Sequence, residues 1–567
     1  MERILRVNMT DRSYRIEPLP EAWRLLGGRA ITSRIVATEV DPLCDPLGPN
    51  NKLVLAPGLL SGTTLSSSSR ISAGAKSPLT GGIKESNGGG QSGLKLAQLG
   101  YRAVIIEGQP REPGWWLLVI GPESVRFERA DDLAGLGQYE TARRLFERFG
   151  RKVGLSVIGP AGEMKMNIAG IGNTDPEGRP GRMCARGGLG AVMGSKGLKA
   201  IVYEDVGWNP PRSLDEAVWK AASKAYVQEL RTQPATAERY PKLGTLGVLE
   251  LVNKVGGLPV HNFRWGQDER ALEIGGIRVR EIILERGGQT THSCMTGCII
   301  QCSNVFVDKE GQEVASSMEF ETHGLLGSNL EIFDVDWIAR FTRECNDLGV
   351  DTIETGGAMG VAMEAGVIRW GDAEGVMRLM GEIRAGTVLG RVLGAGAGIA
   401  GKVLGVQRVP VVKNQTISAY DPRAVKGNGV TYATSPMGAD HTCGNTIALP
   451  IDHLDPSDKV AVSREMQIVA TALDVLGFCN FARGVMSATP QTFADLFNAR
   501  MGTNFTPEEI RRYAVDVIKE EIEFNRRAGL GPETDRLPEW LRTEPLPPHG
   551  AVFDVPEEEL DRIWEGY

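Results

Sequence analysis

One short stretch near the middle of the chain decides how the fold is interpreted: His292-Ser293-Cys294-Met295-Thr296-Gly297-Cys298-Ile299-Ile300-Gln301-Cys302-Ser303. Its thiols stand at positions i, i+4 and i+8, and Gly297 disfavours a regular helix through them. Three thiolates from one loop, joined by a fourth ligand from elsewhere in the chain, commonly hold a four-iron cluster. The stretch therefore predicts a [4Fe-4S] site on Cys294, Cys298 and Cys302.

Other interpretations of this stretch remain open. Three cysteines on one helical face would be small buried hydrophobes, because free Cys is often buried. A zinc site is disfavoured, since structural zinc prefers paired short knuckles and the sequence holds no second knuckle. The spacing also differs by one residue from the three-then-two pattern of radical enzymes, which weakens that interpretation.

The bulk composition places these cysteines in a large globular protein. With 567 residues, 41% of them hydrophobic, the chain should divide into several domains. Eight cysteines are too few for a disulfide scaffold. A net charge of -8 without a long basic run argues against a nucleic-acid partner. We find no signal peptide and no apolar stretch of ~20 residues, so we expect no transmembrane segment and a cytoplasmic location.

The N-terminal part of the chain reads as short strands broken by glycine and proline. Expected strands lie at 53–56, 103–106, 115–120 and 125–127. The chain holds 71 glycines, and the glycine-dense loops at 86–90 and 185–196 suit a large polar ligand. We expect a β-rich domain here.

Helices dominate after Pro210-Pro211. Ser213-Leu214-Asp215-Glu216 is predicted to be a capping box that opens a helix through residue 230. Further helices are expected at about 334–348, 354–366, 372–383, 457–476 and 507–525. The fold prediction is α+β and multidomain, with a β-rich domain at 1–209 followed by two mainly helical domains at 210–411 and 412–567. We find no internal repeat of fixed period, and expect the stretch after Leu537 to wrap the surface.

Two of the predicted helices end alike, at 346–351 and 474–479. In each, Asn346 or Asp474 lies in the last turn, glycine follows three residues later as an expected left-handed cap, and Asp351 or Cys479 comes two residues after it. A carboxylate near a helix C-terminus is unfavourable by ~0.3 to 1 kcal/mol, so a ligand with donor groups should compensate for it. The pair suggests two equivalent heterocycles; the alternative is two ordinary glycine-capped helices that are similar by chance.

Together these features make the chain resemble the aldehyde:ferredoxin oxidoreductase family of tungsten, and sometimes molybdenum, enzymes over nearly its whole length. No single motif would suffice. The resemblance is carried by the cysteine run, the two helix ends, Lys76-Ser77-Pro78-Leu79-Thr80-Gly81-Gly82, Ser86-Asn87-Gly88-Gly89, Glu319-Phe320-Glu321-Thr322 and Ala185-Arg186-Gly187-Gly188-Leu189-Gly190-Ala191-Val192-Met193-Gly194.

The resemblance implies a bis-pterin cofactor on the N-terminal domain, with the helical domains closing over it. It assigns a magnesium ion bridging the pterin phosphates to Asn87 and the Ala185 carbonyl, and phosphate-neutralising roles to Arg70, Lys76 and Arg186. The cofactor loops also hold Gly88, Gly89, Gly187 and Gly188. Asn346 with Asp351, and Asp474 with Gly477, would hold the two pterins, and Cys479 would be the fourth cluster ligand.

Two departures from the family pattern stand in the sequence. The family's commoner cysteine spacing is two then three residues, whereas here it is three then three. The first pterin motif begins with Asn346 instead of Asp, which puts the grip on that pterin and its redox tuning in doubt.

The activity implied by the resemblance is oxidation of an aldehyde with water to a carboxylic acid. Electrons would pass through the cluster to ferredoxin or a ferredoxin-like small subunit. The catalytic candidates are Glu319, favoured over Glu321, and His441. A solvated acidic pair and an ordinary loop histidine are the alternatives. Cys443 could reach the metal, but a buried inert thiol is favoured.

Two further functions remain as alternatives: the catalytic subunit of a low-potential aromatic acyl-CoA reductase of the benzoyl-CoA type, and a non-catalytic iron-sulfur electron-transfer scaffold. The sequence leaves open the choice of tungsten or molybdenum, the size of the substrate and the homo- or hetero-oligomeric state.

Overall fold

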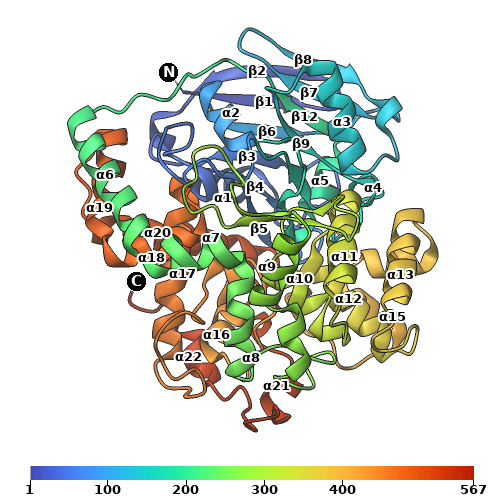
Figure 1. The fold of residues 1–567 in the computed structure, drawn as a ribbon. Helices are drawn as coiled ribbons and strands as arrows, with labels where there is room; N and C mark the ends of the chain where they lie inside the picture. Colours follow the sequence, from blue (N-terminus) through green and yellow to red (C-terminus); the bar gives the residue numbers. More distant parts are fainter. Residues whose placement is uncertain (1) are drawn as a thin grey trace.

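The computed structural model describes residues 2–567. A β-rich N-terminal domain forms the upper part of the molecule, and helices from the rest of the chain lie beneath and beside it (Figure 1). The predicted α+β architecture, with a β-rich domain followed by helical ones, is confirmed. Within residues 2–567, no helix has both the length and the apolar character needed to cross a bilayer.

The first sheet of the β-rich domain is six-stranded, in the order β2-β1-β6-β3-β4-β5. Only β1 and β6 run parallel, and the other neighbours are antiparallel. Helix α1 (Gly28–Glu39) packs on this sheet. Its strands are β1 (Arg3–Asn8), β2 (Ser13–Pro18), β3 (Leu53–Pro57), β4 (Ile71–Lys76), β5 (Ile83–Gly88) and β6 (Tyr101–Glu107).

The second sheet repeats this topology. Its order, read from the other end, is β8-β7-β12-β9-β10-β11, with β7 and β12 parallel and the other neighbours antiparallel. Helix α3 (Gln138–Phe149) packs against β9, as α1 packs on the first sheet. The strands are β7 (Trp116–Ile120), β8 (Val125–Arg129), β9 (Gly154–Val157), β10 (Ile171–Asn173), β11 (Arg182–Cys184) and β12 (Leu198–Tyr203).

The two sheets therefore form a repeat of structure, although the sequence has no internal repeat of fixed period. The two halves differ in the length of their connections, because residues 19–52 join β2 to β3 whereas residues 130–153 join β8 to β9. A sheet requires apolar side chains at buried positions but not particular ones. The sequence can therefore lose a fixed period while the topology persists.

The long helices lie where the sequence predicts them. Helix α6 begins two residues later than a cap at Ser213 would place it, however, because Asp215 is its N-cap and accepts hydrogen bonds from the backbone N–H groups of Ala217 (3.1 Å) and Val218 (3.0 Å), so no capping box forms at Ser213. The capping box lies instead at Thr506 and Glu509. The helices are α6 (Glu216–Thr232), α11 (Val335–Leu348), α12 (Thr352–Glu364), α13 (Ala373–Ala385), α17 (Lys459–Leu476) and α20 (Pro507–Arg527).

The C-terminal stretch is part of the core rather than a surface wrap, which corrects the sequence prediction. Its apolar side chains are spaced among Pro and Glu residues, so the stretch looks hydrophilic in the sequence although one face is apolar. The buried members are Leu541, Leu546, Phe553, Val555, Leu560 and Ile563, and they join the core cluster built on the central helices.

Candidate active site

The two similar helix ends dock on equivalent loops of the two sheets. At the end of α17, the Gly477 carbonyl accepts a hydrogen bond from the N–H of Arg70 (3.2 Å), and the Cys479 N–H donates to the Ser67 carbonyl (2.8 Å). At the end of α11, the Gly349 carbonyl accepts from Gly170 N–H (2.9 Å), and Asp351 N–H donates to the Ile168 carbonyl (3.0 Å). The loops follow β3 and β9, which are corresponding strands.

Both helix ends need glycine at the cap. Gly349 has φ of 72° and Gly477 has φ of 90°, the left-handed conformation that the sequence predicts. Each also meets a glycine of the sheet loop: a Cβ at Gly58 would overlap the backbone of Gly477, and a Cβ at Gly159 would overlap the Leu348 carbonyl. The close approach of helix end and loop therefore requires glycine on both sides.

The cysteine run is a loop, as Gly297 predicts. The loop connects β13 (Gln289–His292) with β14 (Ser303–Val307), and it closes where His292 pairs with Ser303. Ser67 ties the loop to the second helix end, because its Oγ lies 3.2 Å from the Cys298 Sγ and its carbonyl accepts from Cys479 N–H. The four cysteines expected to ligate a cluster therefore converge on one place.

The electrostatics of these thiols are those of a crowded group. Burial, followed by the charges of Cys294, Cys479 and Cys298, raises the pKa of Cys302 well above its usual range. Burial raises the pKa of Cys294 to about 12, against the opposing charge of Arg182. Metal ligation needs thiolates, so a cationic cluster is the natural means of holding four such groups together.

The spacing of the sulfurs separates a cluster from a single zinc ion. Among residues 2–567, the group of three ligand-type side chains whose donor atoms lie within 4.8 Å of one another is Asp175, Glu177 and His292, and it contains no cysteine. Sulfurs around one zinc, at ~2.3 Å from the metal, would be closer together than that. No three cysteine sulfurs among residues 2–567 are therefore as close together as the ligands of one zinc ion.

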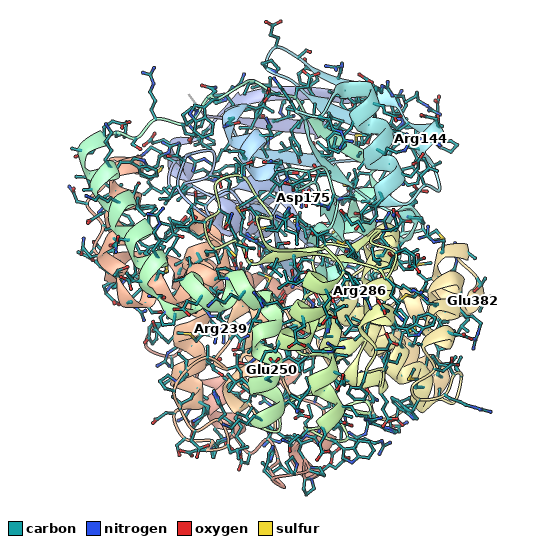
Figure 2. All side chains as sticks on the ribbon, in the orientation of Figure 1. Arg144, Asp175, Arg239, Glu250, Arg286 and Glu382 are labelled. Carbon is teal, nitrogen blue, oxygen red and sulfur yellow. The ribbon has the colours of Figure 1, made fainter. Side chains whose placement is uncertain are left out.

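A cavity of about 390 Å³ lies beside these cysteines, between the β-rich domain and the helices. Figure 2 labels Asp175 of the β-rich domain above Arg286 and Glu250 of the helical part. The cavity gathers most of the site residues expected from the sequence: Arg70, Asn87, Gly89, Ala185, Arg186, Cys294, Cys302, Glu319, Glu321, Asn346, Asp351, His441 and Cys479.

The remaining expected residues do not line this cavity. The Lys76 ammonium points to the Pro42 and Cys44 carbonyls, the latter at 2.7 Å, so it is already engaged. Asp474 lies 3.5 Å from the Arg29 guanidinium, with its pKa raised by burial and by the charge of Glu85. Cys298 lies behind the cavity against Ser67. Gly88, Gly187, Gly188 and Gly477 serve close backbone packing, since a Cβ there would lie against Asn173, Lys84, Pro78 or Ser61.

Arg186 is held by protein groups on several sides. It donates to the Asp351 carboxylate (3.1 Å), the Thr416 carbonyl (2.6 Å) and the Ala439 carbonyl. Asn87 similarly accepts from Arg70 through both its side-chain oxygen and its backbone carbonyl. These two arginines thus fix the loops of the β-rich domain at the cavity wall.

Glu321 and His441 are in contact at the wall of this cavity. The His441 Nδ1 lies 3.4 Å from Glu321 Oε1 and 3.0 Å from the Ser418 Oγ, while Glu321 Oε2 accepts from Ala419 N–H (2.8 Å). Burial raises the pKa of Glu321 to about 8, and burial lowers the pKa of His441 to about 4. Between these values both groups are neutral, so their contact is not an ion pair.

Glu319, which the sequence favours, is differently placed. Its carboxylate accepts from the Thr245 hydroxyl (2.6 Å) and from the Ser317 hydroxyl, so both oxygens have partners. Glu321 Oε1, in contrast, is buried with no hydrogen-bond partner among residues 2–567. The cavity also contains Arg239, Tyr240, Tyr420, Phe481 and Arg483, which carry no spacing signal because they come from three separate segments. Cys443 is buried and burial raises its pKa to about 12, as expected for an inert thiol.

Comparison with known proteins assigns the family. The models of the N-terminal domain and of domains 2 and 3 of aldehyde ferredoxin oxidoreductase match residues 4–205 and 221–567. The chain is 32% identical to the tungsten-containing aldehyde ferredoxin oxidoreductase of Pyrococcus furiosus and 33% identical to that of Pyrococcus abyssi, covering 96% of this chain and 92% of each relative. A more distant relative, the aliphatic sulfonate oxidoreductase WOR-like subunit of Pyrococcus furiosus, is 25% identical over 89% of this chain and 83% of its own.

A solved structure shares the fold. It is described as the active site complex BamBC of benzoyl coenzyme A reductase in complex with 1,5 dienoyl-CoA, with a TM-score of 0.79, 20% identity, and coverage of 94% of this chain and 90% of that one. The fold and the site define an oxidoreductase. The chain belongs to the aldehyde ferredoxin oxidoreductase family.

Proposed function

We propose that this protein oxidises aldehydes to carboxylic acids with a tungsten or molybdenum bis-pterin. Electrons would leave through one [4Fe-4S] cluster to ferredoxin or a ferredoxin-like subunit in the cytoplasm. The observation that carries the proposal is the convergence of four cysteines beside a cavity in which Glu321 Oε1 has no hydrogen-bond partner among the described residues. The family assignment sets aside a non-catalytic scaffold.

The residues that would hold the cofactors divide into two sets. Cys294, Cys298, Cys302 and Cys479 would ligate the cluster. The pterins and the bridging magnesium would contact cavity residues Arg70, Asn87, Gly89, Ala185, Arg186, Asn346 and Asp351, with Asp474 behind the second pterin. When bound, the metal would accept the two electrons that the aldehyde releases.

The chain's own contribution is proton transfer. The reaction turns RCHO and water into a carboxylate, three protons and two electrons, so protons must be removed. Protonated Glu321 can donate Oε1–H to the carbonyl oxygen. Neutral His441, whose Nδ1 is held by Ser418, can take the proton of the attacking water at Nε2. We therefore assign the acid-base roles to Glu321 and His441 and leave Glu319 a positioning role.

These roles predict the pH dependence. Activity should fall above about pH 8, because Glu321 loses its proton, and below about pH 4, because His441 gains one. Glu321→Gln keeps a donor that does not titrate, so it should retain activity within about tenfold and lose the alkaline limb; Glu321→Ala should lose about a hundredfold. A Glu321→Gln variant that keeps the limb near pH 8 would refute the assignment.

The cofactor content and substrate are tested together on protein purified without oxygen. We expect about four irons and one tungsten or molybdenum per chain, and reduction of ferredoxin or a viologen dye on adding an aldehyde. Iron without tungsten or molybdenum would refute the proposal of a bis-pterin enzyme. Reaction with an aromatic acyl-CoA but with no free aldehyde would favour the reductase alternative.

A further inference from the structure

The cavity opens outward past arginines that no carboxylate neutralises. Arg239 lines both the inner cavity and an open outer pocket of about 650 Å³, so it stands where the two meet. The outer pocket lies between α7 (Tyr240–Leu243) and α9 (Gly276–Glu285), and Figure 2 labels Arg239 among these helices. Arg280 lines the outer pocket and Arg483 the inner cavity.

The charges around this passage do not balance. The two carboxylates of the outer pocket are already paired, Glu238 with Lys242 at 3.4 Å and Glu281 with Arg278 at 3.3 Å. Within residues 2–567, no carboxylate oxygen lies within 4.0 Å of Arg239, Arg280 or Arg483. The passage therefore carries positive charge that could receive an anion.

Two of these arginines also lack a hydrogen-bond acceptor. The Nε atoms of Arg239 and Arg280 are buried and have no hydrogen-bond partner among residues 2–567. Buried donors in folded proteins almost always find an acceptor. An unsatisfied Nε–H group at the mouth of a cavity thus points to an acceptor that arrives with a ligand.

The wall between the arginines and the Glu321–His441 pair is aromatic. Tyr240 stacks on Phe481 with ring centroids 4.2 Å apart, and the Tyr420 ring lies 5.8 Å from that of His441. Arg483 is close enough for its charge to act on both rings: burial lowers the pKa of His441 and the charge of Arg483 adds to that effect, whereas burial raises the pKa of Tyr420 and the charge of Arg483 opposes it. The arginines thus lie on one side of the aromatic wall of the cavity, and Glu321 and His441 lie on the other side.

We propose that the substrate is an aldehyde carrying a carboxylate or phosphate at the far end of an apolar body. Arg239 and Arg483 bind the anion, the Tyr240–Phe481 wall packs the body, and Glu321 with His441 receives the aldehyde. This inference rests on the proposed function and narrows its substrate class. Neutral aldehydes of the same size lack the charge-assisted contacts and are poorer substrates.

The test compares matched aldehydes on the holoenzyme. We would measure kcat/KM for 4-carboxybenzaldehyde, 4-formylphenyl phosphate and neutral 4-methylbenzaldehyde with the wild type, Arg239→Gln and Arg483→Gln. The preferred anionic aldehyde should exceed the neutral one by about tenfold or more, mainly through KM, and each variant should reduce that preference to about twofold. The stronger of the two anions identifies carboxylate or phosphate.

Arg231→Gln is the matched control, because it removes the same charge from an exposed residue in the last turn of α6, close to Arg239 in the chain but outside both linings. It should keep the wild-type preference. Equal loss in Arg231→Gln and Arg239→Gln would reduce the effect to long-range charge and overturn the proposal, as would a wild type without preference. Arg239→Lys, which keeps the charge, should restore part of the preference and so guards against a merely structural effect.

Binding without turnover separates this inference from the proposed function. Titration calorimetry on the holoprotein should show terephthalate binding at least about tenfold more tightly than 4-methylbenzoate, and Arg239→Gln should remove that difference. If no aldehyde is oxidised, the proposed function fails while Arg239-dependent binding still supports the anion site. Equal binding of both acids overturns the inference itself.

Discussion

The two halves of the β-rich domain hold their helix ends in the same way but present different chemistry. Gly349 and Gly477 accept hydrogen bonds from the residues just before β10 and β4, and Asp351 and Cys479 donate to corresponding carbonyls. The backbone frame is thus duplicated along with the sheets. Equivalent positions in this frame are occupied by a carboxylate in one half and a thiol in the other.

The surroundings of the two ends explain what each position can do. Asp351 faces Arg186, so its carboxylate is neutralised within the protein. Cys479 lies against Ser67, which also contacts Cys298, so its thiol joins the cysteine group. The first residues differ too, because Asn346 lines the cavity whereas Asp474 lies beside Arg29. Under the proposed function, the duplicated backbone would support two kinds of site: one for a polar ligand only, and one that would also supply the fourth cluster ligand.

The largest effect should come from exchanging the equivalent side chains. Cys479→Ser should lower the iron content from about four per chain to well below that and abolish electron transfer, because a hydroxyl does not replace the thiolate. Asp351→Asn should keep the iron and lower activity by about 10- to 100-fold through the loss of its contact to Arg186. Iron analysis and aldehyde-dependent dye reduction measure both. Loss of iron in Asp351→Asn would show that the two positions are not chemically distinct.

A smaller effect is expected from the glycines that the two halves share. Gly349→Ala and Gly477→Ala combine a left-handed backbone with overlap, since a Cβ at Gly477 would lie 2.6 Å from the Ser61 Oγ and 2.9 Å from the Gly58 Cα. We expect each to lower the free energy of unfolding by about 3 kcal/mol or more. Urea denaturation would measure it.

Gly405 is the matched control for these two glycines. It caps α15 (Ala397–Leu404) with φ of 72°, and a Cβ there would meet nothing within 4 Å. Gly405→Ala should therefore lower the free energy of unfolding only by the cost of the left-handed backbone conformation, about 1 kcal/mol. If all three variants lose the same stability, contact between helix end and sheet loop contributes nothing.

Local patterns in the sequence were sufficient to place the main helices, their glycine caps and the cysteine loop. Each of these depends on neighbours within a few residues, as when Gly477 ends α17. The hydrogen-bond partners of the Lys76 ammonium could not be predicted, because the Pro42 and Cys44 carbonyls belong to another segment of the chain. The contacts that distinguish Glu319 from Glu321 could not be predicted for the same reason, since only the fold places Thr245 against Glu319 and His441 near Glu321.

The duplication of the sheet topology could not be predicted from the sequence, for a different reason. Gly58 and Gly159 hold corresponding positions, but the segments that join the strands differ in length and the side chains on the buried faces are interchangeable. The arginines at the mouth of the cavity could not be singled out from the sequence either. Arg239 and Arg483 are unremarkable in the sequence, and what distinguishes them is the absence of nearby carboxylates in the folded chain.

The smallest effect should follow from Asp474→Asn, which makes the second helix end begin with Asn as the first does at Asn346. Burial and the charge of Glu85 raise the pKa of Asp474 well above its usual range, so the folded protein holds a proton there that the unfolded chain releases near pH 4. The wild type therefore loses stability as pH rises from about 4 through the folded pKa, whereas Asp474→Asn has no such proton to lose. Melting temperatures should agree at pH 4 and diverge at alkaline pH, with the variant higher by a few degrees at most.

The converse change, Asn346→Asp, introduces a carboxylate at a buried position, so this variant should be less stable than Asp474→Asn. The opposite order of stability would mean that the first helix end, not the second, is built to hold a charge.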